Sequence, residues 1–264
     1  MYWEIGSKCG IQENRDKEMK KSFFIFTFVL VFLFSGCATF YNPVTKKEEY
    51  TLYTEKDEID MGIAIDKKIQ KDFKIIPTPE RVEKIGQKIA NVCDRPNLKY
   101  TFRVIKGKEI NAFSIPGGFV YVYTGLLKKI DSDDELACII GHEIAHICAR
   151  DGVHRLQAQI LYSIPATILS SKTRSVAIQK SVDAVFTLTI LKYSREEELR
   201  ADSLGATYAF RAGYNPEGMI KFFYKLKKIE EKNPAIIPVF LKNHPDVEAR
   251  IKNVKETIKK LKIK

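Results

Sequence analysis

Three polar residues in an otherwise apolar helical segment, His142, Glu143 and His146, limit the possible folds of this chain more than any other feature. Four isoleucines stand among them between positions 139 and 147, so the helix that carries the three residues is predicted to be buried. Two imidazoles and a carboxylate are costly to bury without partners. The fold must therefore provide a partner for all three side chains, and a metal ion would do so.

The spacing of these residues favours a catalytic metal site. His142 and His146 are four residues apart, so both imidazoles lie on one helix face and can bind the same ion. Glu143 follows the first histidine directly, where its carboxylate can take a proton from a water molecule whose pKa zinc lowers to about 7. The alternative is a pair of hydrogen-bonded core histidines. We predict one zinc ion per chain, with Glu143 as the catalytic base.

A catalytic zinc of this type needs a third protein ligand and one open position. Glu198 and Asp202 lie four residues apart on a second predicted helix and therefore share a face. Glu198 is the candidate ligand, and Asp202 is the candidate acceptor for the spare N–H of a ligand histidine. Spacing alone does not distinguish this arrangement from a solvated acidic face, to which we assign Glu196 and Glu197.

The periodicity of the chain predicts an α+β fold that is mainly helical, with a small β-sheet beside the motif helix. Helices are expected at about 54–73, 80–92, 132–150, 194–213 and 215–232, and from Pro245 toward the C-terminus. Short strands at 100–105, 110–113 and 119–123 are expected to form a meander. The apolar segment 156–191 is interrupted by Pro165 and by charged residues, so it is predicted to be a helical hairpin rather than a membrane span.

The N-terminal region predicts export and membrane attachment. Met19, the expected true start, is followed by two lysines, the apolar run 22–34 and a small-residue site around Cys37, which is the order of a secretory signal. The apolar run is shorter than the roughly 20 residues that span a bilayer. The site resembles the lipobox of bacterial lipoproteins, in which the cysteine carries the lipid. An uncleaved hydrophobic anchor is the alternative.

Charge and cysteine content exclude two other classes of protein. The net charge of +11 comes from lysines spread along the chain rather than from a basic face with aromatic or arginine partners, so we expect no nucleic-acid binding. A solvated surface explains the lysines, and attraction to an anionic membrane is the alternative. The five cysteines do not support a disulfide framework, and Cys93, Cys138 and Cys148 are expected to be buried free thiols.

Six segments that appear in order closely resemble the gluzincin peptidases, the zinc peptidase family that includes HtpX, BepA and the CAAX prenyl endopeptidases. These segments are Asn111 to Gly118, Gly125 to Leu127, His142 to His146, Tyr193 to Arg195, Glu198 to Asp202 and Ala212 to Pro216. The resemblance extends from about Thr54 to Ile258. It implies an HExxH gluzincin fold, zinc bound by His142, His146 and Glu198, and cleavage of internal peptide bonds.

The resemblance also implies where substrate binds. The strand 119–123 would border the active-site cleft, and an extended polypeptide would pair with Phe119, Val120 and Tyr121 as an added strand. Asn111 would shape the cleft beside this strand, with simple turn chemistry as the alternative.

Two residues near the C-terminus complete the expected site. With Pro245 at the first helical position, His244 falls at the N-cap, where the helix dipole keeps its imidazole neutral. A neutral ring can occupy the open zinc position, as in BepA-like members, or donate to a developing oxyanion. A capping histidine is the alternative. Arg250 is a candidate for stabilising charge in the site.

These observations predict a compact bacterial lipoprotein, because no tetratricopeptide array follows the last helix. We expect a signal region over 1–36, a lipidated Cys37 and tether over 37–53, and a zinc metallopeptidase domain over 54–264. Ala38 is not an inner-membrane retention aspartate, which favours the outer membrane and a domain that faces the periplasm. The expected function is hydrolysis of unfolded or misassembled envelope proteins. The alternatives are a chaperone-like client-binding lipoprotein with a plugged zinc site and a structural lipoprotein with a vestigial one.

Overall fold

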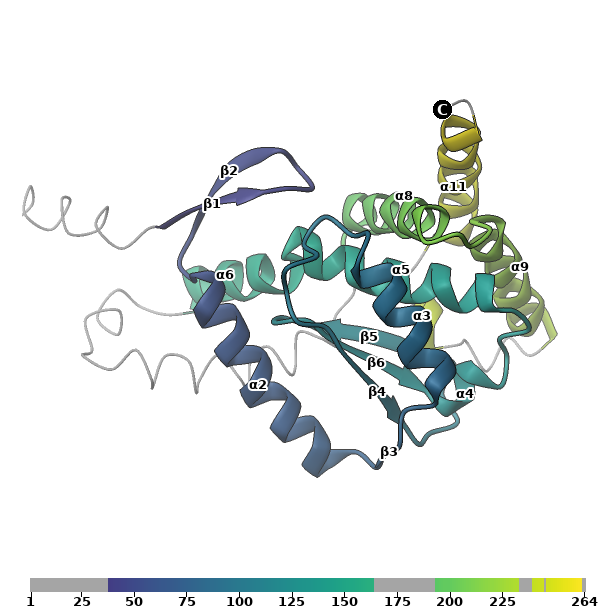
Figure 1. Ribbon diagram of the computed structural model, residues 1–264, viewed down its shortest axis with the longest axis horizontal. Coiled ribbons are helices and arrows are strands. Elements are labelled where there is room, and N and C mark those ends of the chain that lie inside the picture. The colour runs from purple at the N-terminus through teal and green to yellow at the C-terminus, as the bar shows by residue number, and fades with distance from the viewer. Residues whose placement is uncertain (1–37, 164–192, 233–238, 245, 263–264) are drawn as a thin grey trace, which may run out of the picture.

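The computed structural model describes residues 38–163, 193–232, 239–244 and 246–262. Its elements in chain order are β1 (Ala38–Asn42), β2 (Lys47–Thr51), α2 (Glu55–Asp72), β3 (Ile75–Ile76), α3 (Glu80–Ala90), β4 (Thr101–Ile105), β5 (Ala112–Ile115), β6 (Phe119–Tyr123), α4 (Thr124–Leu127), α5 (Asp133–Ala149), α6 (Asp151–Ser163), α8 (Arg195–Arg211), α9 (Glu217–Lys232), α10 (Val239–Asn243) and α11 (Val247–Lys262). Figure 1 shows their arrangement. The expected α+β class with predominant helix is confirmed.

Several expectations fall on residues that the structure does not describe. The signal region and Cys37 lie outside the described residues, and so does most of the apolar segment 156–191, of which α6 covers the start. Among the described residues, none of the helices combines the length and the apolar character that crossing a membrane requires.

The four-stranded sheet has the order β3-β4-β6-β5. β4 and β6 are parallel, and the other two pairs are antiparallel. The expected meander is therefore wrong. In a meander β5 would pair with β4. Instead β6 pairs with β4, and β5 pairs with the other edge of β6. β5 is consequently an edge strand of this sheet, with its outer side not paired to any strand of the described chain.

Alternating side chains of the sheet fill two different cores. In β6, Val120 and Val122 pack into the larger cluster, which contains the apolar residues of α3, α5 and α8. Tyr121 and Tyr123 point the other way, into a cluster with Ile65 and its neighbours on α2. This period of two is the pattern expected of a sheet that is covered on both faces. The sheet is therefore held between α2 on one side and α3 with α5 on the other.

The helix α5, which carries the motif, begins and ends with recognisable caps. Ser132 accepts a hydrogen bond from the Glu135 amide at its start, and Arg150 ends it in the left-handed conformation with φ of 58°. α8 begins with the predicted capping box, in which Ser194 and Glu197 satisfy each other's backbone amides. α5 lies between the sheet and α8, and α9 and α11 pack against these two helices at the end away from α6 (Figure 1).

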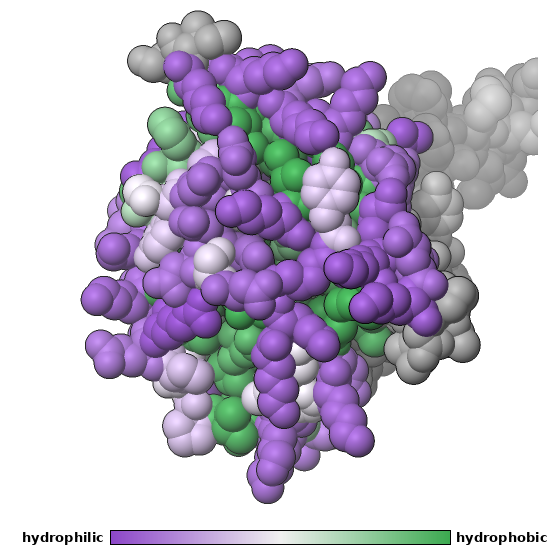
Figure 2. All heavy atoms as spheres, turned by 90° about the vertical axis from the view of Figure 1, so that its right-hand side faces the viewer, coloured by the Kyte–Doolittle hydropathy of each residue, from purple (hydrophilic) through white to green (hydrophobic). Residues whose placement is uncertain are grey.

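Hydrophilic side chains cover most of the surface on the side of α9 (Figure 2), as expected for a solvated lysine-rich surface.

The segment expected to be a polar tether is instead folded. β1 and β2 form an antiparallel hairpin in which Asn42, fully buried, donates a hydrogen bond of 3.2 Å to the Ala149 carbonyl at the end of α5. This hairpin therefore belongs to the folded body.

Candidate metal centre

Four buried side chains converge at the middle of α5. His142 and His146 come from α5, Glu198 comes from α8, and His244 follows α10 directly. One potential ligand atom from each lies within 4.8 Å of those from the other three. His142 Nε2 is 3.1 Å from His146 Nε2 and 3.3 Å from His244 Nδ1. The oxygens of Glu198 lie 3.6 Å from the Nε2 atoms of both α5 histidines. Three imidazoles and a carboxylate are a ligand set that suits zinc.

Close approach of two helices brings these ligands together. A Cβ atom built on Gly141 would lie 2.8 Å from the Gly205 carbonyl oxygen, and one on Gly205 would lie 2.6 Å from the His142 amide nitrogen. Larger residues would therefore separate α5 from α8 at this crossing. Because both positions are glycine, Glu198 and Asp202 of α8 reach His142 across the interface.

His142 is oriented by a buried pair from α8 and α11. Its Nδ1 donates to Asp202 Oδ1 at 2.9 Å, and two nitrogens of Arg250 donate to the two oxygens of the same aspartate at 2.7 Å each. Arg250 also donates to the His244 carbonyl at 3.0 Å and lies 3.2 Å from a Glu198 oxygen. Burial opposes ionisation of Asp202, but the adjacent Arg250 outweighs this effect and lowers the pKa of Asp202. The structure thus brings both sequence-predicted residues to the expected site.

His146 has its own support, which the sequence analysis missed. Its Nδ1 donates to Asp151 Oδ2 at 2.7 Å, and Arg200 of α8 donates to the other oxygen of Asp151 at 2.5 Å. The left-handed turn at Arg150 ends α5 and directs Asp151 back toward the histidine. The Tyr193 ring stacks on the His146 ring, with centroids 3.7 Å apart and an interplanar angle of 12°. A sequence signal existed, since an acid follows the second histidine by five residues, but its use depends on that turn.

Only one of the two carboxylate oxygens of Glu143 accepts a hydrogen bond in the described chain. Ser114 of the edge strand β5 donates to Glu143 Oε2 at 3.1 Å. The other oxygen, Oε1, is buried without a hydrogen-bond partner in the described chain and lies 3.9 Å from His244 Nε2.

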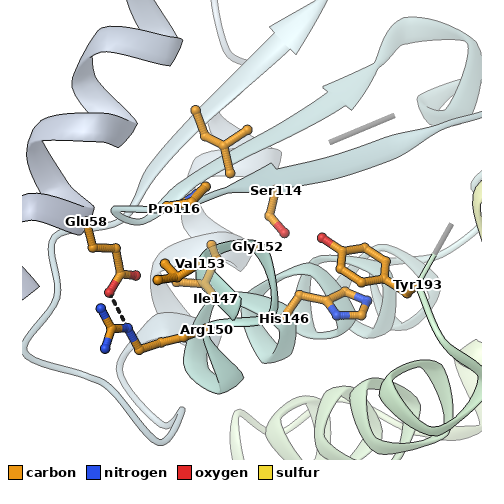
Figure 3. A pocket seen from close by; sticks show the side chains of 10 residues that line it. Glu58, Ser114, Pro116, His146, Ile147, Arg150, Gly152, Val153 and Tyr193 are labelled. Carbon is orange, nitrogen blue, oxygen red and sulfur yellow. Dashed lines mark hydrogen bonds and ion pairs between the residues drawn. The ribbon is translucent and has the colours of Figure 1, made fainter. Parts of the chain in front are cut away.

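In Figure 3, Ser114 and Tyr193 extend toward each other beside His146, at one end of a narrow cavity. The cavity has a volume of about 10 Å³, close to what one water molecule needs.

The pKa shifts differ within this centre: burial lowers the pKa of His142, whereas the carboxylates around His146 attract positive charge. Burial alone would lower the pKa of His146, but its hydrogen bonds to Asp151 and Glu198 raise it to about 10. Burial would raise the pKa of Glu198, yet the charges of His244 and Arg250 hold it well below its usual value. The carboxylate is thus ionised at neutral pH, as a metal ligand must be.

A count of charges gives the same result. The charged groups of the centre, apart from the histidines, are four buried carboxyl groups and two arginines: Glu143, Asp151, Glu198, Asp202, Arg200 and Arg250. With the histidines neutral, as metal ligands must be, the four carboxylates and two guanidinium groups leave two negative charges, which one divalent cation would neutralise. The unpartnered oxygens of Glu143 and Glu198 are also atoms that such a cation and its water could satisfy. The residues present therefore fit a zinc ion.

His244 reaches the centre in a different way from the one expected. Its amide donates to the Phe240 carbonyl at 2.8 Å, so it closes α10 and does not cap α11. The cap of α11 is Asp246, whose side chain accepts from the Ala249 amide at 3.4 Å. The predicted N-cap position is wrong, because Asp246 adopts a left-handed conformation that delays the helix to Val247. The His244 ring stacks on Phe240 with centroids 4.6 Å apart.

The expected substrate strand needs correction. Phe119, Val120 and Tyr121 belong to β6, which is paired with β4 on one side and with β5 on the other. Both edges of β6 are therefore occupied, and an extended polypeptide cannot be added to it. Asn111 precedes β5 and is buried, and its Oδ1 has no hydrogen-bond partner among the described residues. Its role in shaping a cleft stays a prediction.

The amino-acid sequence is similar to one family model and to several known peptidases. The family model described as Peptidase family M48 matches residues 78–258. Mitochondrial metalloendopeptidase OMA1 of Saccharomyces cerevisiae is 26% identical, over 88% of this chain and 74% of that protein. Beta-barrel assembly-enhancing protease of Escherichia coli (strain K12) is 25% identical, over 74% of this chain and 42% of that protein. A relative from Vibrio cholerae is 28% identical over 77% of this chain and 44% of its own length. The chain thus spans less than half the length of these bacterial relatives.

Proposed function

The chain belongs to peptidase family M48, and we propose that it hydrolyses internal peptide bonds with one zinc ion bound by His142, His146 and Glu198. Family membership confirms the resemblance to the gluzincin metallopeptidases, and all six motif segments lie within residues 78–258. The observation that carries the proposal is the convergence of these ligand atoms within 4.8 Å in a buried centre. These three residues would hold a zinc ion, whose Lewis acidity would polarise the scissile carbonyl and lower the pKa of the attacking water.

Glu143 acts as the catalytic base. Its Oε2 is fixed by the Ser114 hydroxyl, so Oε1 is the oxygen left to take a proton. It accepts this proton from the attacking water as the oxygen of that water bonds to the scissile carbonyl carbon. It then passes the proton to the leaving amine as the C–N bond breaks, so that Glu143 returns to its starting charge.

His244 occupies the fourth position around the centre in the resting enzyme. Its Nδ1 lies 2.7 Å from a Glu198 oxygen and 3.3 Å from His142 Nε2, in the same cluster as the three proposed ligands. A substrate carbonyl would need the space that this ring fills, so the ring moves aside when substrate binds. From a displaced position that stays beside Glu143, the ring can donate to the developing oxyanion. Arg250 stabilises the centre by holding Asp202 and balancing the charge of Glu198.

The substrate is an extended polypeptide that pairs with β5. This edge strand carries Ser114, which contacts Glu143, so a peptide added to it would pass beside the base. Main-chain pairing of this kind tolerates many side chains. Unfolded or misassembled proteins of the cell envelope fit this requirement, because their backbones are accessible. The lipobox-like site at Cys37 supports anchoring to the envelope by lipid, with the domain facing the periplasm at the outer membrane.

A client-binding lipoprotein is the second candidate. The plugged fourth position favours it, since His142, His146 and His244 are all no more than 2% exposed. Such a protein would hold extended clients on β5 and would cleave them slowly or not at all.

Metal analysis combined with casein cleavage tests the proposal. We expect one zinc per chain and internal casein fragments identified by mass spectrometry. A chelator should abolish cleavage, and added zinc should restore it. Wild-type protein that is folded, free of zinc and inactive would overturn the proposed function. Stoichiometric zinc without cleavage, together with retained binding of unfolded casein, would support the client-binding alternative.

A further inference from the structure

The outer face of the β1–β2 hairpin carries the two most exposed large apolar side chains in the described part of the chain. Tyr50 is 79% exposed and Tyr41 is 55% exposed. In the register of the hairpin, Tyr50 lies opposite Thr39, and Tyr41 lies opposite Glu48. Directly opposed residues point to the same face of a sheet, and so do residues two apart on one strand. Both tyrosines therefore project from one face as a diagonal pair.

The opposite face of the hairpin is fixed to the body, so the tyrosines cannot turn inward. The Phe40 ring lies 4.3 Å from the guanidinium carbon of Arg150 and 5.6 Å from that of Arg95. Asn42 donates to the Ala149 carbonyl, and the Thr51 hydroxyl donates to Gln157 of α6 at 2.7 Å. These contacts join the hairpin to the C-terminal end of α5. The orientation of its outer face is consequently set relative to the metal centre.

The sequence that precedes the hairpin indicates what covers this face. The apolar run 22–34 and Cys37 come directly before β1, and either a lipid on Cys37 or the run itself would enter the membrane at this point. Thr39 and Tyr41 are only two and four residues along the chain from Cys37, so even a fully extended chain, at about 3.6 Å per residue, keeps them within about 7 and 14 Å of it, and Tyr50 is the cross-strand partner of Thr39. The exposed tyrosines thus stand at the height of the lipid headgroups.

We propose that Tyr41 and Tyr50 insert into the headgroup region of the membrane and fix the orientation of the peptidase on the lipid surface. The tyrosine ring is apolar and its hydroxyl is polar, which is why this side chain gathers at membrane interfaces. Lys46, exposed at the turn of the hairpin, adds one positive charge, but Glu48 shares the face of the tyrosines and Lys47 lies on the other face, so the two tyrosines rather than charge carry the proposal. This inference rests on the proposed membrane attachment, not on peptide hydrolysis. The rigid link to α5 would hold the metal centre at a set distance from the bilayer.

Tryptophan fluorescence on the full-length protein in phosphatidylcholine vesicles with a minor fraction of phosphatidylglycerol tests the inference. Tyr41→Trp and Tyr50→Trp are compared with Tyr224→Trp, which replaces a tyrosine that is 49% exposed on α9, far from the hairpin. Trp3, the single tryptophan of the sequence, precedes both Met19 and Cys37, so protein processed at Cys37 has no tryptophan of its own, and the wild type measures any background from unprocessed chains. We expect the emission of both hairpin variants to shift to shorter wavelength. Lipids brominated near the headgroups should quench this emission and leave that of Tyr224→Trp unchanged.

Each other outcome contradicts the inference in a recognisable way. Protein that sediments with the vesicles while both hairpin probes stay in water would overturn the tyrosine docking and leave the anchor intact. A shift to shorter wavelength without bromine quenching would assign the face to a second copy of the chain or to another protein. Protein that does not associate with vesicles at all would refute the proposed attachment and the docking together, with casein cleavage as the independent measure of the proposed function.

Discussion

Two buried clusters of charged residues lie along α5, and they differ in whether their carboxylate oxygens accept hydrogen bonds within the protein. At the C-terminal end of the helix, both oxygens of Glu58 accept hydrogen bonds, from Arg95 at 2.9 and 3.2 Å and from Arg150 at 2.8 Å. Its acceptor atoms are therefore satisfied within the protein. At the middle of the helix, Glu143 and Glu198 each keep one buried oxygen without a hydrogen-bond partner in the described chain. Burial of charge is common to both clusters, but only the second leaves carboxylate oxygens without a hydrogen bond in the described chain, that of Glu198 lying 3.2 Å from Arg250.

The difference separates a structural ion cluster from a metal centre. In the Glu58 cluster the only unpartnered side-chain atom is Arg150 Nη1, which is a donor and cannot bind a cation. Its guanidinium is covered by the Phe40 ring instead. In the metal centre the unpartnered atoms include two carboxylate oxygens, of Glu143 and Glu198, beside one donor, Arg200 Nε, and the carboxylates outnumber the arginines by two. Substitutions in the metal centre should therefore change zinc content or chemistry, and substitutions in the Glu58 cluster should change stability.

The largest effect is expected from Glu198→Ala. Removing this carboxylate takes away one of three proposed protein ligands, so the protein should lose stoichiometric zinc. Peptide hydrolysis should fall on the order of 10³-fold or more, because several kcal/mol of charge stabilisation are lost with the metal. Metal analysis and casein cleavage measure the two effects. Glu196→Ala is the matched control, since Glu196 lies in the first turn of the same helix but is exposed. Equal zinc content in both variants would show that Glu198 is not a ligand.

Glu143→Gln should separate chemistry from metal binding. The amide keeps the size of the side chain but cannot take a proton, so hydrolysis should fall roughly 10²- to 10⁴-fold while zinc stays bound. Glu135→Gln on the same helix is the control, because Glu135 is also buried but pairs with Lys225 away from the centre. Near-normal cleavage by Glu143→Gln would remove Glu143 from the mechanism.

The sequence predicted much of the metal centre because the decisive spacing is local. His142 and His146 lie one helical turn apart, and Glu198 and Asp202 do as well, so each pair shares a face whatever the tertiary structure. The bounds of β6 also agree with the expected strand at 119–123, where aromatic and β-branched residues alternate. These predictions required no knowledge of how distant segments pack.

The predictions that failed depend on contacts between distant segments. Ser114 reaches Glu143 only because β5 pairs with β6 at the edge of the sheet, and the expected meander placed the strands in another order. Asp151 supports His146 only because Arg150 adopts φ of 58°, a conformation that an arginine rarely takes and that no local pattern indicates. The segment 37–53 is polar, and its hairpin is held by Phe40 and Asn42 against the end of α5.

Glu58→Gln tests the structural side of the comparison. It leaves two arginines without their buried counter-charge, because the Glu58 and Arg95 side chains are only 1% and 6% exposed. Breaking a buried pair in this way typically costs about 3–5 kcal/mol, so the free energy of unfolding in urea should fall by about that amount. Zinc per folded chain should not change. Asp60→Asn on the same helix is the control, since its pair with Lys56 is exposed and should contribute at most about 1 kcal/mol.

The smallest effect, a modest loss of zinc affinity, is expected from Asp151→Asn. This variant tests whether a residue that only supports a ligand belongs to the metal centre or to the folded framework. Asp151 does not bind the metal but fixes the ring of His146 through a hydrogen bond of 2.7 Å. Loss of such a partner typically reduces metal affinity about 10- to 100-fold, so zinc should remain bound at high concentration and be lost more readily to a competing chelator. Asp202→Asn should weaken zinc binding further, because Asp202 also holds Arg250 by two hydrogen bonds. Competitive zinc titration of both variants measures the order. A lower unfolding temperature with unchanged zinc affinity would assign Asp151 to folding alone, as for Glu58.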